Sequence, residues 1–204
     1  MKPKGAGKPL FPVIAGDRFL GLTGGRVRSV VSELDEAWAL ALAEAERRAR
    51  MSGRGEVAEY LALRASNDLA RRTAINWLLS TFITLAGEAN RAGRSIQLAR
   101  NDAHRFRIND ATMVGTLLTF RAGVRQLTVE AGWPREPRDG FMRGGGLAAG
   151  NLKHFGLRGA DEELLLVRQG TDAPRWVVLE RTGARARLVE ARMRRHLERF
   201  LGSG

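Results

Sequence analysis

Residues 132–156 contain the residue types that best suit the binding of an anion. Consecutive glycines allow backbone amides to approach a phosphate closely, and neighbouring cationic side chains supply positive charge. The glycines are Gly144, Gly145 and Gly146, and the cationic residues are Arg135, Arg138, Arg143 and Lys153. The spacing matches neither the mononucleotide pattern Gly-x-x-x-x-Gly-Lys-Ser/Thr nor the dinucleotide pattern Gly-x-Gly-x-x-Gly. We therefore predict an anion loop of another kind; the alternative is a surface loop whose glycines serve backbone geometry alone.

A second candidate surface is the polar face of a predicted sheet. Residues 103–108 alternate, which places His104 and its apolar neighbours on one side of a strand and arginines on the other. The arginines assigned to this surface are Arg105, Arg107 and, from the next hairpin, Arg125. Together with an aromatic side chain such as Trp133 or Phe141, they would hold phosphates while bases stack. Since exposed sheet faces are commonly charged, a solvated face is the alternative.

The C-terminal segment, residues 184–201, has apolar residues at helical spacing and carries a third basic surface. Its arginines recur at steps of seven, three and four residues, so they lie along one side of the predicted helix. They are Arg185, Arg192, Arg195 and Arg199. Such a stripe suits a nucleic-acid backbone; the alternative is a solvated face partly neutralised by Glu190 and Glu198.

Catalytic chemistry has weaker support in the sequence. The polar residues near the predicted strands and the anion loop are Asp102, His104, Glu130, Asp139 and His154. No His-x-His, His-Glu-x-x-His or Gly-x-Ser-x-Gly pattern occurs, and the chain has no cysteine, which excludes thiolate zinc sites and cysteine nucleophiles. We therefore predict no metal, no cofactor and no assigned catalytic residue, with a structural role for His104. An enzyme that uses Glu130, His104 or His154 on a phosphorylated substrate is the alternative.

Composition favours a folded protein with an anionic partner. Hydrophobic residues make up 44% and charged residues 27% of the 204 residues, as in ordinary globular domains. The 34 basic and 22 acidic residues give a net charge of +12, and all but four of the basic residues are arginine. The planar guanidinium matches phosphate geometry, although a GC-rich coding bias also replaces lysine by arginine. Such a bias does not explain the net charge.

The elements that must position these residues fall into three segments. We predict a basic Gly/Pro-rich tail and lead-in over residues 1–24, a helical region over 25–93 and a sheet with a final helix over 94–204. The last two segments can form one compact domain. About three helices are expected, over residues 26–51, 56–65 and 69–91, with a helix cap at 66–68. In the third helix Trp77, Leu78 and Leu85 lie off the main apolar stripe, which indicates packing on most sides.

After Gly93 the apolar period changes to two, which predicts strands. Three hairpins are expected, so the fold class is α+β with a mainly antiparallel sheet of about six strands. The strand pairs are 95–100 with 103–108, 112–120 with 124–131, and 163–168 with 175–180. We place their turns at Asn101-Asp102, Arg121-Ala122-Gly123 and residues 169–174, and we treat residues 132–159 as a long loop.

The chain lacks the sequence features of a membrane or secreted protein. Its longest apolar stretch, residues 74–87, is shorter than the roughly 20 residues of a membrane-spanning helix. No signal-peptide core follows the lysines of the N-terminus. We therefore expect a cytoplasmic location.

These observations predict a non-catalytic nucleic-acid-binding protein, acting on RNA or DNA, that contacts phosphates through the anion loop and the sheet arginines. It would serve as a subunit of a larger nucleoprotein assembly. One alternative is the enzyme described above, of a metal-dependent nuclease-like kind. The other is a protein-interaction module in which the N-terminal helices dock to a partner through apolar residues such as Trp38 and Trp77.

Overall fold

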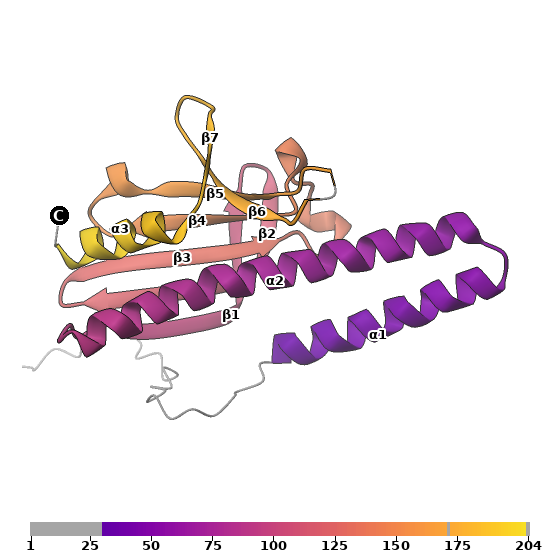
Figure 1. The fold of residues 1–204 in the computed structure, drawn as a ribbon, viewed down its shortest axis with the longest axis horizontal. Helices are drawn as coiled ribbons and strands as arrows, with labels where there is room; N and C mark the ends of the chain where they lie inside the picture. Colours follow the sequence, from indigo (N-terminus) through magenta and orange to yellow (C-terminus); the bar gives the residue numbers. More distant parts are fainter. Residues whose placement is uncertain (1–29, 171, 203–204) are drawn as a thin grey trace, which may run out of the picture.

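The computed structural model describes residues 30–170 and 172–202, so the predicted tail over 1–24 lies outside the described residues. Two helices precede a sheet and a third follows it, which confirms the predicted α+β class (Figure 1). The helices are α1 (Val30–Met51), α2 (Gly55–Arg91) and α3 (Glu190–Leu201). The strands are β1 (Gln97–Ile108), β2 (Ala111–Ala122), β3 (Arg125–Trp133), β4 (Ala148–His154), β5 (Glu162–Val167), β6 (Arg175–Leu179) and β7 (Arg185–Arg187). Short 3-10 turns occupy Pro137–Asp139, Arg143–Gly145 and Arg158–Ala160.

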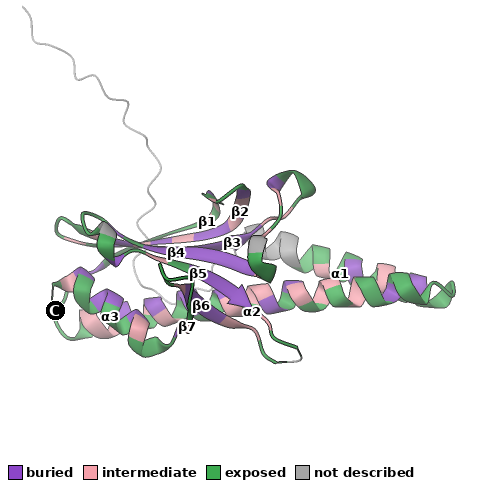
Figure 2. Cartoon of the chain, turned by 90° about the horizontal axis from the view of Figure 1, so that it is seen from above, coloured by how far each residue is buried: buried purple, intermediate pink, exposed green. Residues whose placement is uncertain are grey.

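The helices α2 and α3 cover one face of the sheet. At 37 residues, α2 is about 55 Å long, so it crosses the sheet and extends past it. There it pairs with α1 to form a helical arm whose surface is mostly half-buried or exposed (Figure 2). Against the sheet, α2 places Leu78, Phe82 and Leu85 in the main core, which α3 completes with Met193 and Phe200. Burial of this apolar side stabilises the long helix more than helix propensity does.

The described part of the helical region contains two helices where the sequence predicted about three. Residues 66–68, expected to cap a new helix, lie inside α2. The Asp68 carboxylate accepts a hydrogen bond from Arg71 Nη1 at 2.7 Å, one helical turn further along. The Asp68 side chain, which the sequence suggested as a cap, is therefore held by Arg71, and α2 continues without a break.

The described strands form one antiparallel meander in the order β1 to β7, which confirms the predicted sheet type. The second hairpin is confirmed, but its turn is shorter than the predicted 121–123. Arg121 and Ala122 pair within the sheet, so β2 and β3 join through Gly123 and Val124, and Gly123 has a φ of +58°. The third strand pair, β5 with β6, is also confirmed. The β1–β2 connection is a two-residue turn in which Asn109 has a φ of +53°, a conformation that asparagine tolerates.

Three local predictions were wrong. The pair 95–100 and 103–108 is not a hairpin, because both segments belong to the single strand β1, with a bulge between Asn101 and His104. Residues 148–154, predicted as loop, form β4 in the centre of the sheet. Residues 185–187 form β7 rather than the start of the last helix, since they pair with β6. The sheet therefore has seven strands instead of about six.

Two glycines allow neighbouring strand backbones to approach closely. Gly115 on β2 lies opposite Gly132 on β3. A Cβ at Gly115 would overlap the carbonyl oxygen of Ala131, and one at Gly132 would lie 2.7 Å from that of Val114. Both positions lie on the sheet face opposite the helices, which we call the open face. A second, smaller core on this face includes Met113, Ala149 and Leu165.

Candidate nucleic-acid interface

The sheet arginines do not share one surface. As predicted, Arg105 alternates with His104 along β1, but its Nη2 lies 2.5 Å from Asp139 Oδ1. Asp139 is buried, which raises its pKa, but hydrogen bonds from two backbone amides and from Arg105 outweigh this effect and lower it. Arg107 and Arg125 are exposed at different ends of the sheet's first strands. The structure thus commits Arg105 to an internal ion pair.

The anion loop packs against the open face of the sheet. Gly144 and Gly145 have positive φ angles of +77° and +70°, and a Cβ at Gly146 would overlap the side chain of Leu165. The positive φ angles at Gly144 and Gly145 and the close packing at Gly146 therefore give these glycines a structural role. The guanidinium of Arg135 stacks on the Trp133 ring at 3.4 Å from its centroid. Anion binding by this loop stays a prediction.

Two further arginines of the loop region, Arg138 and Arg143, were also predicted to contact the nucleic acid. The side chain of Arg138 forms an ion pair with Glu136. Arg143 begins a 3-10 turn, and its side chain lies outside the described residues. In the described part of the chain, no contact therefore brings the loop arginines together around a common point.

The C-terminal arginines also divide between surface and interior. Arg192 makes a bidentate contact with Glu162 on β5, with distances of 2.8 to 3.1 Å, and this pairing raises the pKa of Arg192. Arg195 and Arg199 are exposed on α3. Because Arg185 belongs to β7, the predicted stripe does not run along a single helix. Only part of it remains available to a ligand.

A buried carboxylate organises a polar cluster on the open face. Glu130 on β3 is 5% exposed and receives hydrogen bonds from Lys153 Nζ at 2.6 Å and Asn151 Nδ2 at 2.8 Å. Its other oxygen lies 2.8 Å from His104 Nε2. Burial raises the pKa of Glu130, but the hydrogen bonds from Lys153, Asn151 and His104 outweigh it and lower the pKa. The carboxylate is therefore ionised and well satisfied at neutral pH.

The five polar residues considered for catalysis are only partly brought together. Glu130 meets His104, whereas Asp102 accepts a hydrogen bond from Thr116 at 3.0 Å and His154 lies buried against α3. The remaining residue, Asp139, pairs with Arg105. Within the described ranges, no group of three acidic, histidine or cysteine residues is arranged to hold a metal ion. Any acid–base chemistry on the open face would depend on the Glu130–His104 pair.

A groove that the sequence analysis missed lies on the helix-bearing side. It has a volume of about 650 Å³ and runs between α2, the β5–β6 loop, β7 and the start of α3. One wall is a stripe of α2 with Leu69, Thr73 and Trp77 at steps of four residues. The other wall includes Trp176 and Leu188. Trp176 is buried and donates from Nε1 to the Ala74 carbonyl at 2.9 Å, whereas Trp77 is 44% exposed.

Three arginines line this groove, which we call the arginine groove: Arg168, Arg175 and Arg187. Arg168 contacts Ser66 Oγ at 3.4 Å and Asn67 Oδ1 at 3.3 Å, and Arg175 bonds to Gln169. These partners are neutral, and no ion pair with a carboxylate is found for the three arginines among the described residues. The groove's one carboxylate, Glu190, pairs with Arg194 at 3.0 Å. The lining is therefore positively charged.

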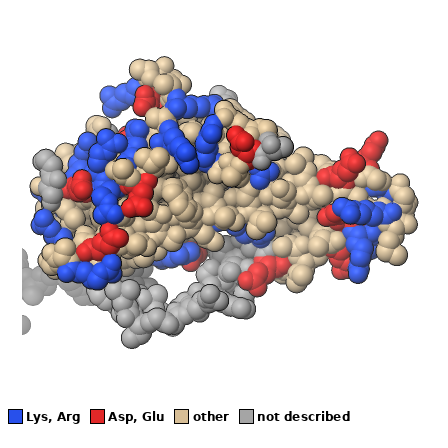
Figure 3. Space-filling view, in the orientation of Figure 1, with Lys and Arg blue, Asp and Glu red and all other residues tan. Residues whose placement is uncertain are grey.

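Basic and uncharged side chains occupy separate regions of the surface around the arginine groove. In Figure 3, basic side chains gather beside α2, over the region of β6, β7 and α3, while an uncharged band follows α2 itself. The sequence contained one signal for this groove, because Trp77 lies off the main apolar stripe of its helix. The opposite wall comes from residues about 100 positions later, which a local pattern does not reveal.

Comparisons with protein families, curated proteins and solved structures gave no match for this chain. Among the described helices, none combines the length and apolarity needed to cross a bilayer.

Proposed function

We propose that this protein binds single-stranded nucleic acid in the arginine groove. Phosphates would contact Arg168, Arg175 and Arg187 at the rim, and an unpaired base would stack on the exposed ring of Trp77. The proposal keeps the partner class expected from the sequence. It moves the main contact site from the anion loop to the groove.

The observation that carries this proposal is the difference in partners between two sets of cationic residues. Arg105, Arg138, Arg192 and Lys153 each pair with a carboxylate. The arginines of the groove contact neutral groups or, for Arg187, no carboxylate in the described part of the chain. A guanidinium without a local counter-charge gains more from a phosphate, because no internal ion pair has to be broken first.

The apolar wall favours a single strand over a duplex. Stacking on Trp77 requires a base whose face is accessible, and the bases of a duplex are already stacked on one another. The wall from Ser66 to Trp77 covers twelve residues of α2, with about 17 Å between the first and the last, which suits a short extended strand. Since stacking tolerates every base, we expect weak sequence preference.

Fluorescence anisotropy with labelled single-stranded RNA, single-stranded DNA and duplex DNA tests the proposal. Affinity for at least one single strand should exceed that for the duplex, and should fall about tenfold or more in an Arg168/Arg175/Arg187→Ala variant. A Trp77→Ala variant should lose affinity for single strands by about tenfold, since stacking contributes about 1–3 kcal/mol per base.

A matched control removes the same charge elsewhere. The Arg107/Arg125/Arg195→Ala variant replaces three exposed arginines that the sequence analysis assigned to binding but that lie outside the groove. Its affinity should fall much less than that of the groove variant. Equal losses in both variants would mean a diffuse electrostatic surface, and no binding to any strand at low salt would contradict the proposed function.

A further inference from the structure

Three exposed apolar side chains lie at the end of the molecule opposite the helical arm. Val124 in the β2–β3 turn is 92% exposed, and Phe155 and Leu157, between β4 and β5, are 74% and 51% exposed. Figure 1 shows the β2–β3 turn, the β4–β5 connection and the last turn of α3 at this end of the sheet. We call these three residues the apolar tip.

Backbone hydrogen bonds fix the two turns that carry the apolar tip. The amide of Phe155 donates to the carbonyl oxygen of Gln126 at 2.9 Å, two residues after Val124 in the chain. The amide of Leu157 donates to the carbonyl oxygen of His154 at 3.2 Å, which closes a β-turn. The three apolar side chains therefore belong to two neighbouring turns of the folded sheet.

Arginines without a carboxylate partner accompany the apolar tip. Arg121 donates to the side-chain oxygen of Gln126 at 3.1 Å, and this partner is neutral. The Arg125 guanidinium lies against Gly202, where a Cβ would overlap it, and so it is placed at the C-terminal end of α3. Arg199 is exposed in the last turn of the same helix. Within the described residues, none of these three arginines forms an ion pair.

Carboxylates reduce the positive charge of this end only in part. Asp161 and Glu198 are the exposed acidic residues closest in sequence to these segments. Asp161 accepts a hydrogen bond from the backbone amide of His154 at 2.8 Å. On α3, the charge of Glu198 is offset by Arg195, which is exposed one turn before Arg199. The sum of the charges around the apolar tip is therefore positive.

We propose that the apolar tip binds the surface of an anionic lipid bilayer. Val124, Phe155 and Leu157 would enter the boundary between the headgroups and the acyl chains, while the arginines contact lipid phosphates. Binding of this kind takes place at the surface and needs no membrane-spanning helix. Anionic lipids are characteristic of the cytoplasmic leaflet, which agrees with the location expected from the sequence.

The combination of side chains favours lipid over the other classes of anionic partner. Nucleic acid gains most from aromatic rings on which bases stack, but two of the three apolar side chains are aliphatic. A protein partner needs a complementary surface of about 800 Å². Apolar side chains on separate turns enter a fluid bilayer without a matching shape, and the arginines complement its negative charge. None of the tip residues lines the arginine groove, so the proposal does not rest on the proposed function.

Co-sedimentation with lipid vesicles tests the proposal. The full chain should sediment with vesicles of phosphatidylcholine mixed with phosphatidylserine, and far less with phosphatidylcholine alone. A Val124/Phe155/Leu157→Ser variant should bind the anionic vesicles about tenfold more weakly or less, because it loses apolar area that lipid would cover. No sedimentation of the wild type, or unchanged sedimentation of the serine variant, would overturn the proposal.

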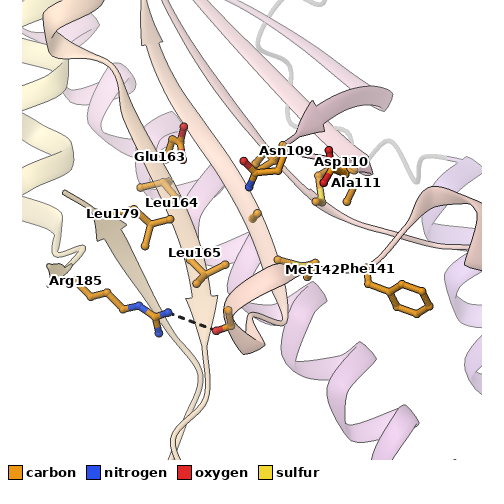
Figure 4. Close-up of a pocket in the computed structure, with 14 residues that line it drawn as sticks. Asn109, Asp110, Ala111, Phe141, Met142, Glu163, Leu164, Leu165, Leu179 and Arg185 are labelled. Carbon is orange, nitrogen blue, oxygen red and sulfur yellow. Dashed lines mark hydrogen bonds between the residues drawn. The ribbon is translucent and has the colours of Figure 1, made fainter. Parts of the chain in front are cut away.

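The matched control replaces three exposed apolar residues elsewhere. Leu40 and Leu63 belong to the helical arm, and Phe141 stands at the rim of a hollow on the open face (Figure 4). That hollow lies at the β1–β2 turn, at the opposite end of β2 from Val124. The Leu40/Leu63/Phe141→Ser variant should sediment like the wild type. An equal loss in this variant would contradict the assignment of the apolar tip.

A net charge of +12 attracts the protein to any anionic surface, so the arginines need a control of their own. An Arg121/Arg125/Arg199→Ala variant should bind anionic vesicles about tenfold more weakly or less. The groove variant, which also loses three arginines, should keep most of its vesicle affinity. Equal losses in both variants would mean attraction by net charge alone and would overturn the proposal.

The absence of cysteine allows a direct measurement of insertion. A Phe155→Cys variant that carries an environment-sensitive fluorophore should shift its emission to shorter wavelength on anionic vesicles, because the label leaves water. The same label in Phe141→Cys should not shift. No shift at residue 155, or equal shifts at both positions, would contradict insertion of the tip. Single-strand binding by the Val124/Phe155/Leu157→Ser variant should stay as in the wild type, which separates this test from that of the proposed function.

Discussion

His154 on β4 and His196 on α3 stack in the protein interior, with His154 Nε2 2.9 Å from His196 Nδ1. The Nε2 atom of His196 lies 3.1 Å from Glu162 and donates a hydrogen bond to its carboxylate. His196 Nδ1 is then an acceptor, and His154 donates to it as a neutral ring. Arg192 completes the chain by its bidentate contact with Glu162. These contacts join α3 to the sheet.

The histidine pair predicts a loss of stability at mildly acidic pH. Burial is the largest cause that lowers the pKa of His154, and electrostatic interactions with His196 and Arg199 lower it further. Asp161 and Glu162 raise it by less, so the pKa is about 4. An unfolded histidine titrates near pH 6.5, so the unfolded state binds more protons between pH 6.5 and 4. The free energy of unfolding should therefore fall by about 3 kcal/mol as the pH drops through this range.

Urea denaturation at several pH values checks this prediction. The His154→Gln variant keeps a donor to His196 and removes the titration, so its unfolding free energy should vary much less between pH 6.5 and 4. A second acid transition belongs to Glu162, whose pKa is about 2: burial raises it, but His196 and Arg192 lower it more. The stability from Glu162 should be lost below about pH 4.5. An unchanged slope in His154→Gln would show that other groups control the acid response.

We expect Gly115→Ala to destabilise the sheet strongly. The added Cβ would overlap the Ala131 carbonyl oxygen, and a backbone atom cannot rotate away as a side chain can. The free energy of unfolding should fall by about 3 kcal/mol. Gly159→Ala is the control, because nothing lies within 4 Å of a Cβ at that position. Its stability should stay within about 0.5 kcal/mol of the wild type.

Glu130→Gln separates a structural role from a catalytic one. The change weakens the contacts with Lys153 and His104, so thermal denaturation should show a loss of about 1–3 kcal/mol. Affinity for single-stranded nucleic acid should change by less than about twofold, because Glu130 lies on the opposite face from the arginine groove. Hydrolysis of a phosphorylated substrate by the wild type, abolished in a folded Glu130→Gln variant, would instead support the enzyme alternative.

The salt dependence of binding should report the number of phosphate contacts. For single strands, the logarithm of affinity falls with the logarithm of salt by about 0.7 per phosphate contacted. The Arg168/Arg175/Arg187→Ala variant should therefore have a slope smaller by about 2 between roughly 50 and 200 mM salt. A slope equal to that of the wild type would indicate that these arginines do not contact phosphates.

Local sequence patterns were sufficient to predict a hairpin where residue types marked both the turn and its two strands. The hairpin around Gly123 combines alternation with a glycine at positive φ, and the structure confirms it. Asn101-Asp102 has the same kind of residues but produces a bulge, because residues 97–101 and 104–108 both pair with β2. Only the register with a neighbouring strand distinguishes a turn from a bulge.

β4 was missed because its residues carry no alternating pattern. Its first residues, Ala148, Ala149 and Gly150, are small and buried between β3 and β5. Ala148 packs in the main core on the helix side and Ala149 in the smaller core on the open face, so this part of the strand has no polar face. Its glycine permits a close approach to the backbone of β3. In sequence it is therefore difficult to distinguish from the glycine-rich loop before it.

The sequence by itself determined the fold class, the antiparallel sheet and the positive charge, because periodicity and composition are local or additive properties. The tertiary structure decided which charges remain available. Arg105 and Arg192 pair with carboxylates 34 and 30 residues away, whereas Arg168 lies in a groove with Trp77. Pairing between distant residues depends on how β5, β6 and α3 pack against α2. No local pattern encodes that packing, so the candidate site could be recognised only in the tertiary structure.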